Sequence, residues 1–366
     1  MKDPFVTIIV LCWNSLADIA DCLNSINNQT YTNFKIVIID NCSTDGTVKY
    51  IQENYPHIKV IKLSKNYGYR RGNSIGMKSV KGDFLVICND DIRVQMNWLD
   101  EMVRAMHDDV GLVTPLILFD QDPEIVNAAG NTLHYSGMCG PRGKNDLREM
   151  HEAPITVSAV SGCCFMVRRE LLHSLGYFST DFDRLDVGWH ASFEEVDLGW
   201  RAMLRGYRIQ YAPKSVMYHK YKQPEMFHSR FGAYEWGRYL IILRNYSIFS
   251  LLMLFPLLVF QEICAWGYAL SKGKAHFSAK LNVMKWLVTH PQGILTMRES
   301  IQKTRLVSDY DVVRQLDSML SLSGDGKRGK LSLAINYFFK TVSFAYFQIF
   351  IGFLRVESFL NSNKNY

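Results

Sequence analysis

The sequence lacks the patterns that mark several large classes of protein. Its eight cysteines form no Cys-x-x-Cys pair and lie mostly in apolar stretches, which indicates buried free thiols in a reducing compartment. No Lys/Arg-rich run stands out, and a net charge of +6 is too diffuse to indicate a nucleic-acid partner. The spacing of a Walker phosphate-binding loop is also missing. Since 48% of the 366 residues are hydrophobic, a disordered chain is excluded.

The opening segment MKDPFVTIIVLCWNS contains an apolar patch, but no small-residue cleavage site follows it. Asp3 and Pro4 precede the patch, which is typical of a first strand rather than of a signal peptide. We therefore expect a cytoplasmic protein.

The first half of the chain alternates between strand and helix patterns. Continuous apolar runs predict strands at 5–12, 35–40, 58–63 and 83–88, with helices between them at 16–27, 45–55 and 68–80. Strands with this pattern are buried on both faces and pair in parallel through right-handed crossovers. The sequence thus predicts an α/β fold, a mostly parallel sheet sandwiched by helices. Ligands of such sheets bind at the carboxyl ends of the strands, where Asp40 and the cluster Asn89–Asp91 fall.

The character of the sequence changes near residue 225, and we expect domains at 1–225 and 226–366. Residues 245–261 are uncharged but contain Pro256, and residues 341–354 form a second apolar run. Each run is short or interrupted for a helix that crosses a bilayer, which needs about 20 apolar residues. We expect helices that lie in the membrane interface. The alternative is a helical subdomain that packs on itself or forms a homodimer.

Two stretches indicate recognition of a nucleotide. Asp40 can accept hydrogen bonds from a ribose or a base edge, although DNCSTDGT also suits an ordinary capped turn in which Thr44 or Asp45 caps the next helix. KNYGYRRGNSIGM, residues 65–77, brings Arg70 and Arg71 to a helix N-terminus, where they could clamp a diphosphate.

Acidic side chains form two further clusters. Asp90 and Asp91 follow a buried strand, and paired carboxylates there suit Mg²⁺ or Mn²⁺ held partly by substrate phosphates; a capped turn is the alternative. Several acidic residues in FEEVDL lie at the start of a predicted helix. Burial could bring the pKa of one of them close to neutral pH, which would suit a general base. Partnership with the helix dipole is the simpler explanation for any one of these residues. His219 ends a later β-like run and could supply a metal ligand.

The order of the motifs resembles the inverting family-two glycosyltransferases, which have the GT-A fold. The motifs are PFVTIIVLCWNS, IVIIDNCSTDGT, LSKNYGYRRGN, FLVICNDDIRV, GCCFMVRRELLHSLGYF and FEEVDLGWRAMLRGYRIQYAP followed by VMYH. The resemblance covers roughly residues 4–225. It is greatest to the branch that contains bacterial rhamnosyltransferases of surface polysaccharide synthesis, which also carries a tail like RESIQKTRLVSD.

The resemblance implies a peripheral enzyme on the inner face of the cell membrane that transfers a sugar from a nucleotide-sugar to a glycan or lipid-linked saccharide. Glu195 would be the catalytic base, with Glu194 and Asp197 as alternatives because EE replaces the usual ED pair. Asp91 and His219 would hold the metal. The implied acceptor-side residues are Gly162 and Trp189, and the implied donor-binding residues are Thr7, Asn14, Asp40, Asn66, Arg70, Arg71, Asn73 and Asp90.

Three rival functions share parts of this pattern. A polyprenyl-phosphate sugar synthase would have the same nucleotide half but clearer membrane spans. A nucleotidyltransferase would release pyrophosphate and has no use for the EExD carboxylates. A membrane-associated protein that binds nucleotide-sugars without turnover would not need the acidic cluster at Asp90 and Asp91.

Overall fold

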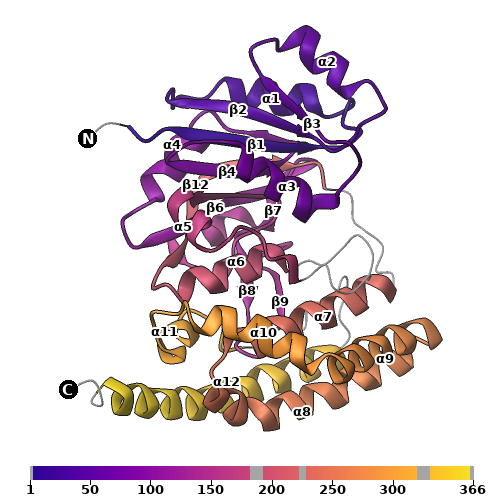
Figure 1. The fold of residues 1–366 in the computed structure, drawn as a ribbon, viewed down its shortest axis with the longest axis vertical. Coiled ribbons are helices and arrows are strands. Elements are labelled where there is room, and N and C mark those ends of the chain that lie inside the picture. Colours follow the sequence, from indigo (N-terminus) through magenta and orange to yellow (C-terminus); the bar gives the residue numbers. More distant parts are fainter. Residues whose placement is uncertain (1–2, 182–192, 222–227, 320–329, 363–366) are drawn as a thin grey trace. The chain divides into compact units, whose positions relative to one another are not determined.

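The computed structural model describes residues 3–181, 193–221, 228–319 and 330–362. Its packing divides the chain into two compact units, and Figure 1 labels their elements along the sequence. Unit 1 consists of residues 1–131, 141–179 and 207–224, and unit 2 consists of residues 132–140, 180–206 and 225–366. The segments 132–140 and 180–206 therefore group with the C-terminal helices, unlike in the expected division at 225/226.

Unit 1 begins with the predicted alternation of strands and helices. The strands are β1 (Val6–Cys12), β2 (Phe34–Asp40), β3 (Lys59–Lys62) and β4 (Phe84–Asn89), and the helices are α1 (Ile19–Asn27), α2 (Thr47–Asn54) and α3 (Gly68–Ser79). These four strands are parallel and lie in the order β4-β1-β2-β3. The predicted sheet and its helices are confirmed for this part of the chain.

The rest of unit 1 makes the sheet mixed. Its elements are β5 (Ile92–Val94), α4 (Trp98–Ala105), β6 (Val110–Phe119), β7 (Asp122–Ala128), the 3₁₀ helix η1 (Arg148–His151), β10 (Ile155–Thr156), β11 (Cys164–Arg168), α5 (Arg169–Ser174) and β12 (Arg208–His219). β11 lies antiparallel between β4 and β6, and β12 pairs in parallel with β6. The sequence pattern missed β6, which contains Pro115. A register shift in β12 between Ala212 and Val216 lies opposite this proline, and such irregularities are where sheets accept proline.

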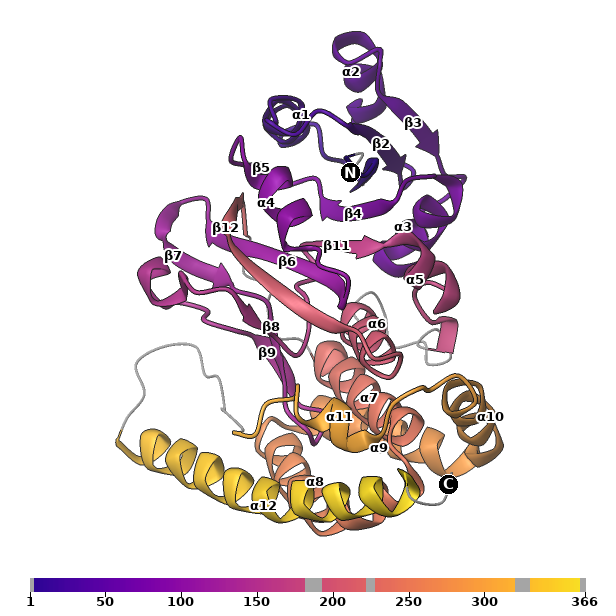
Figure 2. The same cartoon turned by 90° about the vertical axis from the view of Figure 1, so that its left-hand side faces the viewer.

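Helices cover both faces of this sheet. Figure 2 shows α1 and α4 on one face and α3 and α5 on the other. The core on the first side joins Ile8 and Val10 of β1 to Leu23 of α1 and Trp98 of α4. On the second side α3 approaches the sheet closely at Gly76. This close contact fixes the helix that carries Arg70 and Arg71.

Unit 2 is largely helical. Its helices are α6 (Glu194–Met203), α7 (His228–Asn245), α8 (Ile248–Ser271), α9 (Lys274–Thr289), α10 (Pro291–Gln302), α11 (Asp309–Val313) and α12 (Lys330–Ser362). The hairpin of β8 (Asn131–Leu133) and β9 (Cys139–Pro141) contributes its tip, where Tyr135 stacks on Phe350 and donates a hydrogen bond to the Ser343 carbonyl of α12.

Two helices of unit 2 are longer and more apolar than the sequence pattern predicted. α8 continues through Pro256, so the expectation of an interrupted run is wrong; the proline lies on the exposed side of the helix. Ile248–Ser271 and Asn336–Leu360 are both long and apolar enough to cross a membrane by length and composition, and only 22% of an 18-residue apolar stretch in each is buried. The two helices are in contact, since Tyr346 of α12 donates a hydrogen bond to the Met253 carbonyl of α8.

The close packing of α3 leads to a first prediction. A Cβ atom at Gly76 would lie 2.7 Å from Cγ1 of Ile39 and 3.1 Å from Cγ2 of Ile9. We expect Gly76→Ala to lower the free energy of unfolding by about 1–3 kcal/mol, because overpacking outweighs the gain in helix propensity. Urea denaturation measures the change. Gly352→Ala in α12, where a Cβ meets open space, is the control, and an equal effect of both substitutions would contradict the packing argument.

Candidate active site

The predicted acidic residues converge at one edge of the unit 1 sheet. In the register of the parallel strands, Asp40 lies beside Cys12 and Asn89 lies beside Leu11, so the ends of β2 and β4 flank the end of β1. Parallel strands present their carboxyl ends on the same side, which is where α/β sheets bind ligands. The predicted convergence of Asp40 with the cluster that begins at Asn89 is thus confirmed.

Asp90 anchors the loop that follows β1. Its Oδ2 accepts a hydrogen bond from the Ser15 hydroxyl and a longer one, 3.3 Å, from the Trp13 amide. Burial raises the pKa of Asp90 to about 6, against the opposing effect of the Ser15 hydrogen bond. Asp90 therefore shapes the wall of the candidate site through the β1–α1 loop.

Asp91 faces His219. Asp91 Oδ1 lies 3.4 Å from His219 Nε2, and the side chains are largely buried. Burial alone would raise the pKa of Asp91, but His219 holds it below its usual value. Burial alone would likewise lower the pKa of His219, whereas Cys163 and Asp91 raise it well above its usual value. The pair is an imidazolium and a carboxylate that stabilise each other. A cation bound by His219 Nε2 would replace the proton on that nitrogen.

The backbone of β12 brings His219 to this position. Opposite β5, His219 pairs with Ile92, and the next residue, Lys220, donates its amide to the Asp91 carbonyl at 2.9 Å. The other ring nitrogen, Nδ1, lies 3.2 Å from Oδ1 of Asn127, an acceptor that orients the ring with Nε2 toward Asp91. Sequence reasoning missed Asn127, which lies at a strand end in a stretch without a recognisable motif.

These residues fit a divalent cation. Apart from the contact with His219, Asp91 Oδ1 is a buried oxygen without a partner among the described residues. A carboxylate and an imidazole oriented by an amide oxygen match the ligands and outer contacts of protein metal sites. Within the described ranges, no group of three or more His, Cys, Asp or Glu could hold a metal by itself. Two protein ligands suit Mg²⁺ or Mn²⁺ that is held mainly through substrate phosphates.

Loops from two strands enclose Asp40. Asn14, which has a positive φ of 54°, accepts a hydrogen bond from the Thr44 amide at 2.8 Å through its side-chain oxygen. The Ser43 amide donates to Asp40 at 3.1 Å. The predicted helix cap at Thr44 or Asp45 is wrong in position, because the N-cap is Gly46 with φ 92°; Asp45 instead accepts from the Thr47 amide inside the first turn.

Asn66 connects the end of β2 to the start of α3. Its Oδ1 accepts hydrogen bonds of 2.8 Å from the Asn41 side chain and from the Gly68 amide, where α3 begins. Arg70 and Arg71 follow in the first turn of α3, as predicted. Asn73 is fully buried in the same helix, and its amide group has no hydrogen-bond partner among the residues that the structure describes.

Three further candidates lie elsewhere or outside the described residues. Thr7 is fully buried near the amino end of β1, opposite the edge that carries Asp40, and its hydroxyl donates to the Lys81 carbonyl. The Gly162 carbonyl accepts a hydrogen bond of 2.6 Å from Tyr69. Trp189 lies outside the described residues.

In unit 2, the EExD carboxylates occupy the first turn of α6, and all three are buried. Glu194 accepts a hydrogen bond from the Phe193 amide at 3.1 Å. Burial and the neighbouring charge of Glu194 raise the pKa of Glu195 to about 8. A carboxylate with a pKa near neutrality is suited to general base catalysis.

Asp197 has a different environment. Its Oδ2 accepts a hydrogen bond from Arg201 Nε at 2.8 Å, and its Oδ1 pairs with Arg244 of α7. Arg244 also pairs with Asp181 at 2.7 Å. Both oxygens of Asp197 are therefore engaged by buried guanidinium groups. Sequence reasoning missed Arg244, which lies 47 residues from Asp197 and in no recognised motif.

Comparisons with known proteins agree with this architecture. Residues 7–176 match the family model described as Glycosyl transferase family 2, so this part of the chain is similar to that family. A crystal structure of GalNAc-T7 with UDP, GalNAc and Mn²⁺ superposes with a TM-score of 0.53 at 17% identity, covering 79% of this chain and 58% of that one. At this identity the similarity concerns the fold, and it confirms the predicted GT-A type of α/β architecture.

Two curated relatives show sequence similarity over part of their length. An uncharacterized glycosyltransferase of Haemophilus influenzae is 33% identical over 24% of this chain and 29% of its own length. A poly-beta-1,6-N-acetyl-D-glucosamine synthase of Staphylococcus aureus is 24% identical over 58% of this chain and 48% of its own length. This chain thus spans less than half of each of these relatives.

Because Glu195 is buried, we expect the free energy of unfolding to fall as the pH rises. With a pKa of about 8 in the folded state against 4.5 ordinarily, the folded protein holds this proton more tightly, so stability falls as the pH rises from about 4.5 to about 8. Glu195→Gln removes this loss. At pH 9 we expect the variant to be more stable than the parent by a few kcal/mol, since one pKa unit corresponds to about 1.4 kcal/mol.

Urea denaturation at about pH 5 and pH 9 measures this effect, and the difference should shrink at the lower pH. Glu53→Gln, at an exposed position of α2, controls for the substitution itself. A Glu195→Gln variant that is less stable than the parent at pH 9 would show that the ionised Glu195 carboxylate does not destabilise the folded protein.

Proposed function

We propose that this protein is a metal-dependent inverting glycosyltransferase. It transfers rhamnose or another hexose from a nucleoside diphosphate donor to a hydroxyl of a growing cell-surface glycan or lipid-linked saccharide. The observation that carries the proposal is the Asp91–His219 pair, oriented by Asn127 at the sheet edge that also presents Asp40. The family 2 match and the polysaccharide synthase among the relatives support the class of reaction and of product.

The donor occupies the carboxyl edge of the unit 1 sheet in this proposal. Asp40 accepts hydrogen bonds from the nucleoside, and Asn14 and Asn66 hold the loops around it. The start of α3, with Arg70 and Arg71, attracts the diphosphate. Thr7 is left out of the donor set because its hydroxyl is buried at the opposite end of β1.

Asp91 and His219 are the residues that would hold Mg²⁺ or Mn²⁺. When bound, the cation neutralises the charge that develops on the leaving diphosphate. The two neighbouring aspartates have different roles in this proposal. Asp90 accepts hydrogen bonds from the β1–α1 loop, whereas Oδ1 of Asp91 has no partner other than His219 among the described residues.

Glu195 is the base in this proposal. Asp197 is disfavoured because two arginines engage both of its oxygens, and a carboxylate paired with buried cations is a weak base. Glu194 accepts a hydrogen bond from the Phe193 amide. Burial and the neighbouring charge of Glu194 raise the pKa of Glu195, which suits Glu195 to the role of base. Glu195 takes the proton of the acceptor hydroxyl as that oxygen attacks the anomeric carbon from the face opposite the diphosphate, so one displacement inverts the configuration.

A second candidate function is favoured by the lengths of α8 and α12. Each contains a segment long and apolar enough to cross a membrane, as expected for a synthase that transfers sugar to polyprenyl phosphate. The product distinguishes the two functions, because only the second forms a sugar phosphodiester on a lipid. Incubation with radiolabelled donor and polyprenyl phosphate, followed by thin-layer chromatography, would reveal it.

Activity provides the third prediction. With Mn²⁺ or Mg²⁺ and a panel of nucleotide-sugars, the purified protein should release a nucleoside diphosphate, and a chelator should abolish the release. Asp91→Ala and Glu195→Gln should each lower kcat by at least about 10²-fold, the scale of a lost catalytic group. Asp122→Asn, at an exposed position of β7, should leave kcat unchanged. Near-parental activity of Glu195→Gln would move the base to Glu194 or Asp197.

We further propose that the protein lies on the inner face of the cell membrane through α8 and α12. One side of α8 is buried within unit 2, including Leu254, Leu257 and Gln261, so lipid can reach only the other side. That side exposes Leu252, Phe255 and Ile263, each more than 60% accessible. A helix with one apolar side exposed along its length is suited to lying in the plane of the interface.

Vesicle binding tests this placement. Leu252→Glu combined with Ile263→Glu should weaken sedimentation with vesicles of phosphatidylcholine and phosphatidylglycerol at least about tenfold, because each large apolar side chain contributes about 1.5–3 kcal/mol when buried. Met96→Glu combined with Met150→Glu, at exposed apolar positions of unit 1, is the control. Unchanged sedimentation of the α8 variant would refute the placement.

A further inference from the structure

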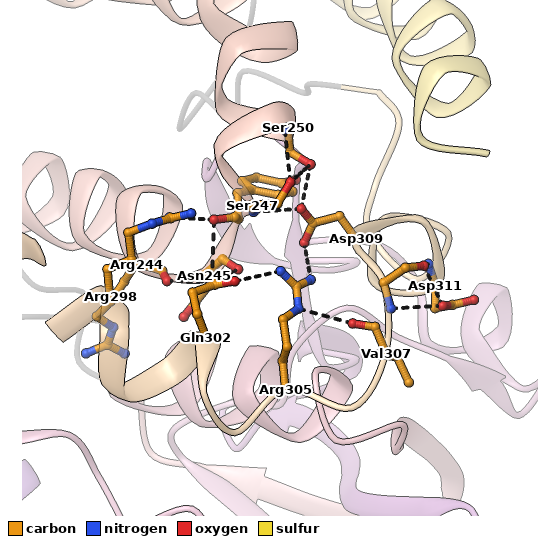
Figure 3. A network of polar contacts seen from close by, with 12 residues as sticks. Arg244, Asn245, Ser247, Ser250, Arg298, Gln302, Arg305, Val307, Asp309 and Asp311 are labelled. Atoms are coloured by element: carbon orange, nitrogen blue, oxygen red, sulfur yellow. Dashed lines mark hydrogen bonds and ion pairs between the residues drawn. The ribbon is translucent and has the colours of Figure 1, made fainter. Parts of the chain in front are cut away.

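We infer that Arg244 is a positioning residue for the proposed base Glu195, and that the segment RESIQKTRLVSD, residues 298–309, holds Arg244 in place. The inference rests on the proposed function, since it assigns Glu195 as the base. All residues involved belong to unit 2. Figure 3 shows the polar contacts between this segment and the stretch from Arg244 to Ser250.

The segment caps the end of α7. The last carbonyl groups of a helix have no partner within the helix and need donors from elsewhere. Arg298 Nη1 donates to the Leu243 carbonyl at 2.8 Å, and Gln302 Nε2 donates to the Arg244 and Asn245 carbonyls at 3.0 and 2.8 Å. The backbone at Arg244 is thus fixed by side chains of α10.

The same segment caps the start of α8. Asp309 Oδ2 accepts a hydrogen bond of 2.7 Å from the Ser247 amide and one of 2.5 Å from the Ser250 hydroxyl. Arg305 links the two ends of the segment, because it donates to Gln302 at 2.8 Å and to Asp309 at 2.6 Å (Figure 3). The turn between α7 and α8 is therefore held from both sides.

From this fixed turn, the Arg244 side chain reaches α6. It is 1% exposed and pairs with Asp197, two residues after Glu195, and with Asp181. Arg201 completes a group of two buried cations and two carboxylates. A rotation of α6 would separate buried charges from their partners, which is strongly unfavourable.

Two further contacts hold α6. The Leu306 amide of the segment donates to the Leu204 carbonyl at the C-terminal end of the helix, at 2.8 Å. At the N-terminal end, Phe193 packs so closely on α7 that a Cβ on Gly237 would clash with its ring. The segment thus acts on α6 directly at its C-terminal end and through Arg244 near its N-terminal end, and both contacts restrain the helix that carries Glu195.

Conservative substitutions test the inference. Arg244→Lys keeps the charge but loses the planar group that spans Asp197 and Asp181. Gln302→Ala removes the caps on the Arg244 and Asn245 carbonyls and perturbs the network less. Lys303→Met, in the same segment but 71% exposed, is the control. In each full-length protein, kcat, KM for the donor, the pH profile of kcat and the hydrogen exchange of α6 amides are measured.

For Arg244→Lys we expect kcat to fall at least about tenfold while KM for the nucleotide-sugar stays within about twofold, because the base is displaced and the donor residues are untouched. The acidic limb of the pH profile should move below about 8 as Glu195 gains water. The titratable groups that interact with Glu195 are Glu194 and Cys139 of β9, and Tyr234 of α7 interacts with Cys139 in turn. Burial raises the pKa values of Cys139 and Tyr234, so neither should titrate in this part of the profile. Gln302→Ala should produce smaller changes in the same directions.

Loss of folded protein alone would scale kcat without moving the pH profile. The inference is overturned if Arg244→Lys and Gln302→Ala leave the profile and the exchange of α6 amides as in the parent, whatever happens to kcat. If Arg244→Lys does not fold, Gln302→Ala decides. If the parent turns over no nucleotide-sugar, the proposed function fails. Faster hydrogen exchange confined to α6 in the two variants would still support the conclusion that Arg244 and residues 298–309 hold α6 in position.

Discussion

A buried carboxylate must be paired with a cation, bound by hydrogen bonds or protonated, and this constraint sorts the acidic residues of this protein by role. Asp197 is paired with two arginines and serves the structure. Asp91 faces a single histidine that is held by a neutral amide, an arrangement that a divalent cation can join. Glu195 is buried beside the carboxylate of Glu194, and both the burial and this charge raise its pKa to about 8. In the proposed function, chemically similar side chains therefore serve as anchor, ligand and base because their surroundings differ.

The two halves of the proposed reaction belong to different parts of the chain. The parallel strands of unit 1 bring Asp40 and the residues after β4 to one edge, as in any sheet of this type. The base belongs to a short helix whose position depends on helices far along the sequence. The helices α8 and α12, which expose apolar side chains, belong to unit 2 as well.

Local patterns were enough to predict β1 to β4, α1 to α3 and the convergence of Asp40 with Asn89, because buried parallel strands and their crossover helices leave a clear trace in the sequence. β6 was missed because Pro115 suggests a break, and a bulge in its neighbour β12 accommodates that proline. The partners Asn127 and Arg244 were missed for another reason. They lie 92 and 47 residues from the side chains they contact, and a single sequence does not report such pairings.

The central claim is that Asp91 and Glu195 act on the same donor and acceptor. The most direct test is a crystal structure of the protein with Mn²⁺ and a nucleoside diphosphate, measured near the manganese absorption edge. The account predicts an anomalous peak in contact with the Asp91 carboxylate and His219, the diphosphate on that ion, and the Glu195 carboxyl group facing the same cavity. Manganese bound away from Asp91, or Glu195 with no access to the cavity that holds the diphosphate, would contradict it.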